Sequence, residues 1–316
     1  MRLLLMYEPS AQHRAALTAA APGATLLVAR SEAEAQQLIA EADAVLGNRY
    51  FLQALPYARR LRWMQSNSMG MDLILRAGEQ LREVVLTNAR GVYDDELAEH
   101  CLALALALAR GLHLARDRQQ QRRWERMPLA TLAGRRALIL GWGGVGRAIA
   151  RRLRALGMTV AGVRRSHQGP PAPDADGFLI WGPASWRAAL PHTDLLILAL
   201  PLTPDTYRLV GAEELAALPA HAWLINIGRG ATLDESALLH ALASDRLAGA
   251  ALDVLADEPP PPDHPIWAEA RVLLTPHVGR SLEQPPYRWE ALFVENVRRF
   301  AAGEPLLNVV DQQRGY

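Results

Sequence analysis

The chain has 316 residues, of which 50% are hydrophobic and 21% are charged, and its formal net charge is +1 at pH 7. This length favours two domains over one, and the near-neutral charge argues against nucleic acid or an anionic membrane surface as a partner. The single cysteine, Cys101, excludes an intramolecular disulfide and suits a reducing, cytoplasmic location.

The first ninety residues alternate short apolar runs with helical patterns. RLLLMY at residues 2–7 is too short for a signal peptide and is followed at once by Glu8 and Pro9, so a β-strand is predicted there. A helix is predicted near residues 10–20, and Ser31 followed by Glu34 marks the start of another. Further strands are predicted at 24–29, 44–47, 61–66 and 84–89. This alternation predicts a mostly parallel sheet.

From Asp94 to Trp124 the pattern changes to one long predicted helix, alanine-rich first and polar later. Its apolar run from Cys101 to Ala109 falls short of the roughly 20 residues that span a membrane, so no membrane partner is expected. A buried, inert thiol is the expectation for Cys101. We place the domain junction near the start of this helix. Residues 1–96 and 283–316 are predicted to form one domain and residues 97–282 the other.

A second β–α series follows the long helix. Strands are predicted at 136–141, 158–163, 194–200, 222–227, 248–254 and 271–276, and the Pro/Gly/Asp-rich stretch 167–177 is predicted to be a loop. Ligands of open α/β sheets bind at the carboxyl ends of the strands. The residues that follow these strands are therefore the candidates for chemistry.

The first strand of this series runs into a glycine loop. Gly141, Gly143 and Gly146 form G-x-G-x-x-G between a predicted strand and a predicted helix, with Gly144 and Val145 between them. This context is typical of a dinucleotide-binding loop, in which glycines allow close approach of a pyrophosphate to the helix N-terminus. The alternative is a glycine-rich turn without a ligand.

The next strand ends in Arg164, Arg165 and Ser166 instead of the acid that usually accepts from the ribose 2′-hydroxyl of NAD. Two arginines and a serine suit a 2′-phosphate. NADP(H) is therefore the predicted cofactor and NAD(H) the alternative, unless the three residues are only a solvated basic turn.

Three later strand ends carry Arg229, Glu258 and His277, separated by 29 and 19 residues. These spacings suit successive β–α or β–loop units that converge on one site. Taken singly, each residue has an ordinary alternative: a surface ion pair for the arginine, a solvated loop position for the acid, and a strand-end position for the histidine.

The motifs GWGGVG, PLTPDT, INIGRG, ALDVLADEP, HPIW and TPHVG stand in the order of the D-2-hydroxyacid dehydrogenases, which the chain resembles over nearly its whole length. The arginine pair and the terminal QRGY are most similar to the glyoxylate/hydroxypyruvate reductase branch. The resemblance implies an α/β fold of two doubly wound parallel-sheet domains, with a Rossmann cofactor domain inserted in a smaller flavodoxin-like substrate domain.

The resemblance also implies residue roles. Arg229 would bind the carboxylate of a 2-oxo acid and polarise its carbonyl, and His277 would be the general acid in reduction. Glu258 would pair with the imidazole, favour its protonated form and orient it. Asp253 would hold the nicotinamide amide, and Pro201 would lie in a loop near the cofactor.

Further expectations follow from the resemblance. Ser68, Met69 and Gly70 match a loop whose backbone N–H groups contact the substrate carboxylate, and the long helix is the expected homodimer surface. No Cys/His or acidic cluster has metal-ligand spacing, so no metal is expected. Arg280 stands where small residues are more usual.

The predicted function is NADPH-dependent reduction of a small 2-oxo acid, such as glyoxylate or hydroxypyruvate, to the D-2-hydroxy acid. The alternatives are an NAD-linked D-2-hydroxyacid or phosphoglycerate dehydrogenase and a non-catalytic dinucleotide-sensing protein of the same fold. Formate dehydrogenase is disfavoured, because that branch lacks an acid at the Glu258 position.

Overall fold

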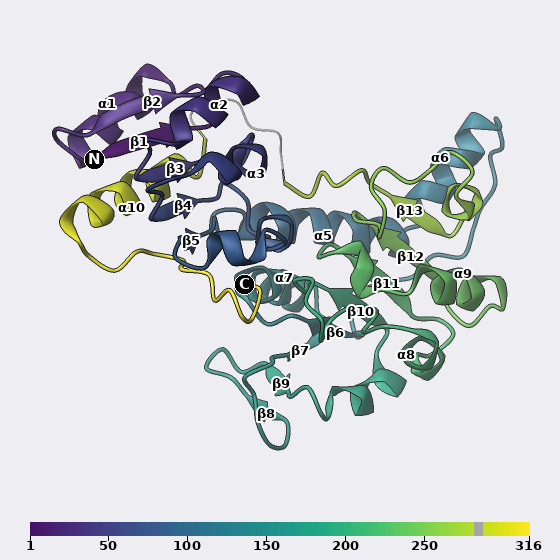
Figure 1. Cartoon of the computed structure of the whole chain (residues 1–316). Coiled ribbons are helices and arrows are strands. Elements are labelled where there is room, and N and C mark those ends of the chain that lie inside the picture. The colour runs from purple at the N-terminus through teal and green to yellow at the C-terminus, as the bar shows by residue number, and fades with distance from the viewer. Residues whose placement is uncertain (281–286) are drawn as a thin grey trace. The chain divides into compact units, whose positions relative to one another are not determined.

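The structure is a computed structural model that describes residues 1–280 and 287–316. The chain divides into two compact units, which we call unit 1 (Met1–Tyr93 and Leu282–Tyr316) and unit 2 (Asp94–Ser281) (Figure 1). The predicted boundaries at 96/97 and 282/283 stay predictions, and the second of them lies outside the described residues.

Unit 1 is built on a parallel sheet with the strand order β2-β1-β3-β4-β5. Its strands are β1 (Arg2–Leu5), β2 (Thr25–Val28), β3 (Ala44–Leu46), β4 (Trp63–Gln65) and β5 (Val85–Thr87). Its helices are α1 (Ala11–Ala20), α2 (Glu32–Ile39), α3 (Phe51–Ala54), α4 (Asp72–Leu75) and α10 (Glu290–Ala302), with short 3-10 helices at Leu55–Tyr57 and Gly78–Leu81. Apart from Arg2 at the start of β1, the residues of the central strands β1, β3 and β4 are buried, as expected for a parallel sheet covered by helices on both faces.

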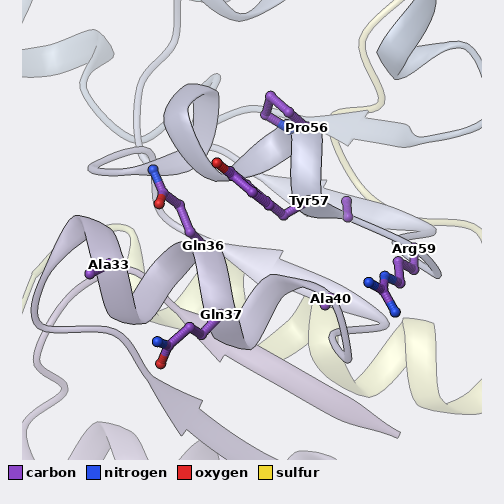
Figure 2. Close-up of a pocket in the computed structure, with 8 residues that line it drawn as sticks. Ala33, Gln36, Gln37, Ala40, Pro56, Tyr57 and Arg59 are labelled. Carbon is purple, nitrogen blue, oxygen red and sulfur yellow. The ribbon is translucent and has the colours of Figure 1, made fainter.

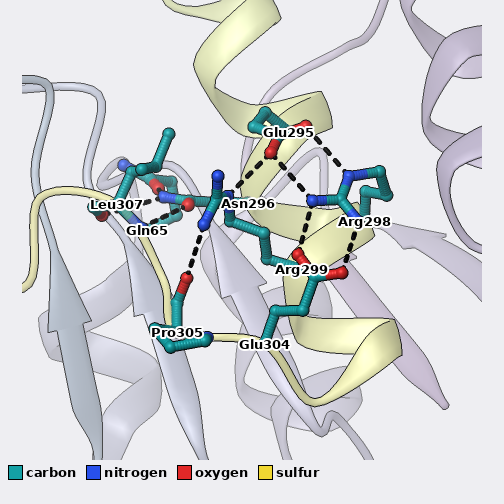
Figure 3. Close-up of polar contacts among 8 residues, drawn as sticks. All are labelled: Gln65, Glu295, Asn296, Arg298, Arg299, Glu304, Pro305 and Leu307. Atoms are coloured by element: carbon teal, nitrogen blue, oxygen red, sulfur yellow. Dashed lines mark hydrogen bonds and ion pairs between the residues drawn. The ribbon is translucent and has the colours of Figure 1, made fainter.

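The C-terminal helix α10 belongs to unit 1 and is tied to its sheet by side-chain hydrogen bonds (Figure 3). The amide of Asn296 donates to Gln65 Oε1 at 2.7 Å and to the Leu307 carbonyl at 3.1 Å. Nearer the surface, Arg298 bridges Glu295 and Glu304. Because Asn296 and Gln65 are fully buried, their mutual hydrogen bond satisfies polar groups that water cannot reach.

Unit 2 is built on a larger sheet with the order β13-β12-β11-β10-β6-β7-β9-β8, parallel except for β8. Its strands are β6 (Arg136–Leu140), β7 (Thr159–Val163), β8 (Ala172–Pro173), β9 (Leu179–Trp181), β10 (Leu195–Leu198), β11 (Trp223–Asn226), β12 (Gly249–Leu252) and β13 (Val272–Leu274). Its helices are α5 (Asp94–Ala109), α6 (Leu112–Gln120), α7 (Gly144–Ala155), α8 (Ala212–Ala217) and α9 (Glu235–Ala243), with 3-10 helices at Trp186–His192, Gly230–Thr232 and Pro265–Ala268.

Both strand orders confirm the predicted α/β class. The order 2-1-3-4-5 in unit 1 is flavodoxin-like, and β9-β7-β6-β10-β11-β12 in unit 2 is the Rossmann order. In unit 2 the chain adds β7 and β9 on one side of β6 and then returns to add β10, β11 and β12 on the other side. The order in which strands are added therefore reverses between β6 and β10. A ligand of such a sheet binds outside the carboxyl ends of the strands at this switch point.

The prediction of a single long helix from Asp94 to Trp124 is wrong, because the structure has two helices there, α5 and α6. α5 and α6 are bent by 64° at Gly111, whose left-handed φ of 57° is a conformation that glycine adopts without strain. Figure 1 shows α6 turning away from the direction of α5. The residues of α5 that face the core include Cys101, which is fully buried as predicted.

Taken one at a time, the helices in the described part of the chain are too short or too polar to cross a membrane.

The loop predicted at 167–177 is wrong in part, since it contains β8, and the prediction also missed β9. Asp174 accepts hydrogen bonds from the backbone of Asp176 and Phe178 and shapes the turn between the two strands. Gly177 takes the left-handed conformation there, with φ 77°. Strands this short give too little periodicity to be recognised from sequence.

Candidate active site

Arg229 follows β11 in a turn that only glycines permit. A Cβ on Gly228 would lie 2.7 Å from the Leu200 carbonyl oxygen, and a Cβ on Gly230 would lie 1.8 Å from the Leu255 carbonyl carbon. The buried Asn226 fixes this turn by accepting from Gly228 N at 3.0 Å and donating to the Arg229 carbonyl at 3.1 Å. Arg229 itself is half-buried, and the glycines on either side of it pack against the residues that follow β10 and β12.

Glu258 and His277 form a close pair at the ends of the next two strands. The Glu258 Oε2 atom lies 2.6 Å from His277 Nδ1, and Glu258 Oε1 accepts from Leu255 N at 3.0 Å. Leu255 also packs against Gly230, so the turn that carries Arg229 and the loop that carries Glu258 are in contact. The three predicted catalytic residues therefore occupy one edge of the sheet.

The backbone around His277 is held by Asp253, at the end of β12. His277 has a left-handed φ of 53°, which costs a non-glycine residue about 1–2 kcal/mol. Its N–H donates to the Asp253 carbonyl oxygen at 2.8 Å. The next two amides, of Val278 and Gly279, donate to the Asp253 carboxylate at 3.0 and 2.9 Å. These hydrogen bonds hold the conformation that presents the imidazole.

The Asp253 carboxylate is itself held from two sides. Thr275 Oγ1 donates to it at 2.6 Å, and His100 Nε2, from α5, lies 3.2 Å away. Burial alone would raise the pKa of Asp253, but the hydrogen bonds from His100, Thr275 and the two amides outweigh burial and lower it. The contact to a nicotinamide amide stays a prediction, and the structure adds a positioning role for this acid.

Sequence analysis missed His100 and Thr275 as parts of this site. His100 stands in an apolar helical run 175 residues before Thr275, and the two side chains lie 3.1 Å apart. The only sequence signal was a histidine at the start of the apolar run of this helix. His13 and His221, which have no evident partner in the sequence, also have one in the structure, Tyr7 and Asp194 respectively.

The glycine loop lies at the switch point and suits a dinucleotide. A Cβ on Gly141 would lie 2.3 Å from the Ala199 carbonyl oxygen, and a Cβ on Gly146 would lie 2.1 Å from the Gly141 carbonyl oxygen. Gly143 and Gly144 are exposed where α7 begins, whereas Val145 is buried beneath the loop. The N-terminus of a helix that begins in glycines is a typical binding place for a pyrophosphate. Here the Asp94 carboxylate lies against Gly144, where a Cβ would come within 1.8 Å of Asp94 Oδ2.

The strand next to the glycine loop, β7, ends in Arg164, Arg165 and Ser166, all exposed. Arg165 Nη1 lies 3.8 Å from Asp205 Oδ2 in an exposed ion pair. Such a pair contributes about 0–1 kcal/mol, so an incoming phosphate could displace it. Pro201 lies beyond β10, and its carbonyl accepts from Thr206 Oγ1 at 2.7 Å, which closes the loop at the switch point.

In unit 1 the predicted substrate loop Ser68–Gly70 follows β4. The Ser68 N–H already donates to Ser66 Oγ at 2.9 Å, and its hydroxyl accepts from Asn48 at 3.1 Å. The Met69 carbonyl accepts from Asn88 at 2.8 Å. The amides of Met69 and Gly70 are thus better placed to serve a ligand than that of Ser68. The substrate-binding role of this loop stays a prediction.

A cavity of about 500 Å³ lies elsewhere in unit 1, between α2 and residues 56–59 (Figure 2). Its volume alone would suit a small ligand. Its lining, however, has no carboxylate or imidazole, and consists of Ala33, Gln36, Gln37, Ala40, Pro56, Tyr57, Ala58 and Arg59. This chemistry does not point to acid–base catalysis. Within residues 1–280 and 287–316, no group of three or more His, Cys, Asp or Glu side chains could hold a metal ion.

Comparison with known proteins points to one family. The family model described as "D-isomer specific 2-hydroxyacid dehydrogenase, NAD binding domain" matches residues 102–279. The chain is 32% identical over 286 residues to a glyoxylate/hydroxypyruvate reductase B of Pectobacterium carotovorum, covering 87% of each chain.

Two solved structures are similar over nearly the whole chain. One is a D-isomer specific 2-hydroxyacid dehydrogenase from Xanthobacter autotrophicus in complex with NADPH and MES, with a TM-score of 0.82, 32% identity and coverage of 99% of each chain. The other is an NADPH-dependent glyoxylate/hydroxypyruvate reductase from Sinorhizobium meliloti in complex with NADP and sulfate. Its TM-score is 0.83 at 28% identity, and the match covers 100% of this chain and 99% of that one.

Proposed function

The chain belongs to the D-isomer specific 2-hydroxyacid dehydrogenases, a family of NAD(P)-dependent oxidoreductases, and from this premise we propose that it reduces a small 2-oxo acid with NADPH. The proposed substrate is glyoxylate, hydroxypyruvate or a close relative, and the proposed product is the D-2-hydroxy acid. The observation that most supports a catalytic role is the 2.6 Å Glu258–His277 pair on the sheet edge that also carries Arg229.

Arg229 is the proposed carboxylate ligand. A planar guanidinium forms paired hydrogen bonds with a carboxylate, and a partly buried position strengthens them relative to water. The turn at Gly228 and Gly230 presses the backbone against neighbouring strands and so restricts where this side chain can reach. One end of the 2-oxo acid would thereby be fixed and its carbonyl polarised.

His277 is the proposed general acid. Glu258 engages Nδ1, so Nε2 is the nitrogen that would donate a proton to the ketone oxygen. Asp253 holds the backbone on both sides of His277, which keeps the imidazole at one position. A bound nicotinamide would supply the hydride that reduces the ketone carbon.

The preference for NADPH is proposed from the end of β7. Gly141, Gly143 and the α7 N-terminus would hold the pyrophosphate, and Arg164, Arg165 and Ser166 would hold the 2′-phosphate. Forked arginine–phosphate contacts favour NADPH over NADH. NADH has only a neutral ribose hydroxyl at that place, so with NADH the arginines would stay in water. Two of the similar solved structures are complexes with NADPH or NADP, which agrees with this proposal.

The test is cofactor oxidation by the purified protein with NADPH and NADH in parallel, against glyoxylate, hydroxypyruvate, pyruvate and phenylpyruvate. We expect faster turnover with NADPH and at least one of these acids. His277→Gln should lower kcat by about 10²–10⁴-fold and leave NADPH binding intact. The exposed His240→Gln serves as the matched control and should retain turnover.

The other outcomes separate the alternative functions. A preference for NADH would overturn the assignment of Arg164–Ser166 and leave an NAD-linked dehydrogenase. Cofactor binding without turnover on any 2-oxo acid would favour a dinucleotide-sensing protein. Near-normal turnover by His277→Gln would exclude His277 as the general acid.

We also propose a homodimer that uses the α5–α6 region, as the resemblance implies. Leu112, Trp124 and Leu129 in and after α6 are 56%, 100% and 49% exposed, which leaves apolar surface for a second copy. A cytoplasmic location stays a prediction from the single cysteine.

A further inference from the structure

Trp142 stands inside the glycine loop, at a position where the loop itself needs no large side chain. Its side chain is buried, with 5% of the residue exposed, and it lies over β7. A Cβ on Gly162 would lie 1.9 Å from Trp142 Cε3, so this strand residue must be glycine to admit the ring. The indole thus connects the glycine loop with the adjacent strand β7.

The indole also reaches the β8–β9 turn. Trp142 Nε1 donates to Asp174 Oδ2 at 2.8 Å, while Asp174 Oδ1 accepts from the amides of Asp176 and Phe178, each at 3.0 Å. The Phe178 ring packs edge-on to the indole, with 5.4 Å between ring centroids. One carboxylate therefore organises its own turn and joins it to the glycine loop. We call this contact the 142–174 bridge.

The segment that carries the two arginines runs from β7 to β8, and the 142–174 bridge links its two ends. This segment leaves β7 at Arg164, whose N–H donates to the Trp181 carbonyl at 3.0 Å, and returns at β8. Between these points the His167 ring lies 2.9 Å from the Pro170 carbonyl oxygen. The segment itself is mostly exposed, so few buried contacts hold it. Its position depends on the strands at its ends and on the turn that the bridge holds.

From this geometry we infer that Trp142 and Asp174 are positioning residues for cofactor specificity, which hold Arg164, Arg165 and Ser166 where a 2′-phosphate can reach them. The inference rests on the proposed use of NADPH. A partly buried hydrogen bond from an indole N–H to a carboxylate is stronger than one between two neutral groups. Loss of this hydrogen bond would release the β8–β9 turn. The arginines would then lose more conformational entropy on binding the phosphate than they do in the wild-type protein.

The test is Trp142→Phe, which keeps an aromatic ring over Gly162 and removes the N–H. KM for NADPH should rise about tenfold, while KM for NADH and kcat at saturation should change less than about twofold. Asp174→Ala, at a half-buried turn position, should reproduce this split if Trp142→Phe folds poorly. Hydrogen exchange of residues 164–178 in the cofactor-free protein should be faster in both variants.

The matched control is Trp63→Phe in unit 1, which removes the same kind of bond, from Trp63 Nε1 to Thr87 Oγ1 at 2.9 Å. It should change neither KM. Equal weakening of both cofactors in Trp142→Phe, or an unchanged NADPH KM with unchanged exchange, would overturn the inference alone. A wild-type preference for NADH would overturn the proposed cofactor and this inference together.

Discussion

At the scale of single residues, the exposure of the Glu258–His277 pair argues against a role in stabilising the fold. The Glu258 and His277 side chains are 35% and 50% exposed, and polar side-chain pairs this accessible contribute little to folding. Yet the backbone next to His277 is fixed in a left-handed conformation by several hydrogen bonds to Asp253. A strained backbone that is held by hydrogen bonds and presents an exposed imidazole is typical of a functional site.

This pair gives the residue-scale prediction. Glu258→Gln keeps a side chain of the same size but removes the charge opposite the imidazole, so kcat should fall by about 10- to 100-fold with little change in cofactor KM. The control is His221→Gln, which breaks another histidine–carboxylate contact, to Asp194 at 2.7 Å, outside the site. Steady-state kinetics would check both variants. Wild-type kcat in Glu258→Gln would remove the acid from the mechanism.

At the scale of elements, the packing of α1 against α10 in unit 1 buries a histidine. His13 is 2% exposed, its Nε2 lies 2.7 Å from Tyr7 Oη, and its ring contacts Trp289 at 5.9 Å between centroids. Glu290 Oε2 lies 3.8 Å from Nδ1. Burial lowers the pKa of His13 to about 4. The folded chain therefore keeps this imidazole neutral where an unfolded chain would protonate it.

The element-scale prediction is a loss of stability in mild acid. Between pH 6.5 and about 4 the unfolded chain binds the proton that folded His13 refuses, so the free energy of unfolding falls as the pH falls through this window, by up to about 3 kcal/mol. His13→Gln, which can still accept from Tyr7, should flatten this slope in urea titrations. The exposed His192→Gln should keep the wild-type slope, and an equally steep slope in His13→Gln would contradict the assignment.

At the scale of the whole molecule, the prediction concerns assembly. Sedimentation at micromolar concentration should give the mass of a homodimer, and the double variant Leu112→Ser, Trp124→Ser should shift it toward the monomer. Leu73→Ser, at a site that is 59% exposed in unit 1, is the control for loss of exposed apolar surface and should remain dimeric. A monomeric wild-type chain would exclude the proposed dimer.

Much of the architecture was readable from local sequence. Periodicity predicts the strands and the helix that follows the glycine loop, and sequence displays it directly. Local motifs likewise place Arg229, Glu258 and His277 at strand ends. In a parallel sheet, strand ends share one edge, so the order of elements already implied that these side chains gather.

Tertiary structure decided what lies far apart in sequence. The support of Asp253 by His100, the bond from Trp142 to Asp174, and the pairing of β8 with β9 each depend on which strands become neighbours and in which register. The break at Gly111 was visible as a glycine, but a glycine inside a helical pattern is often tolerated, and only packing selected its left-handed conformation. Local sequence thus predicted the candidate reacting groups, and contacts between distant segments show what holds those side chains in place. The physical reason is that chemistry depends on the side chain present, whereas position depends on contacts between distant segments.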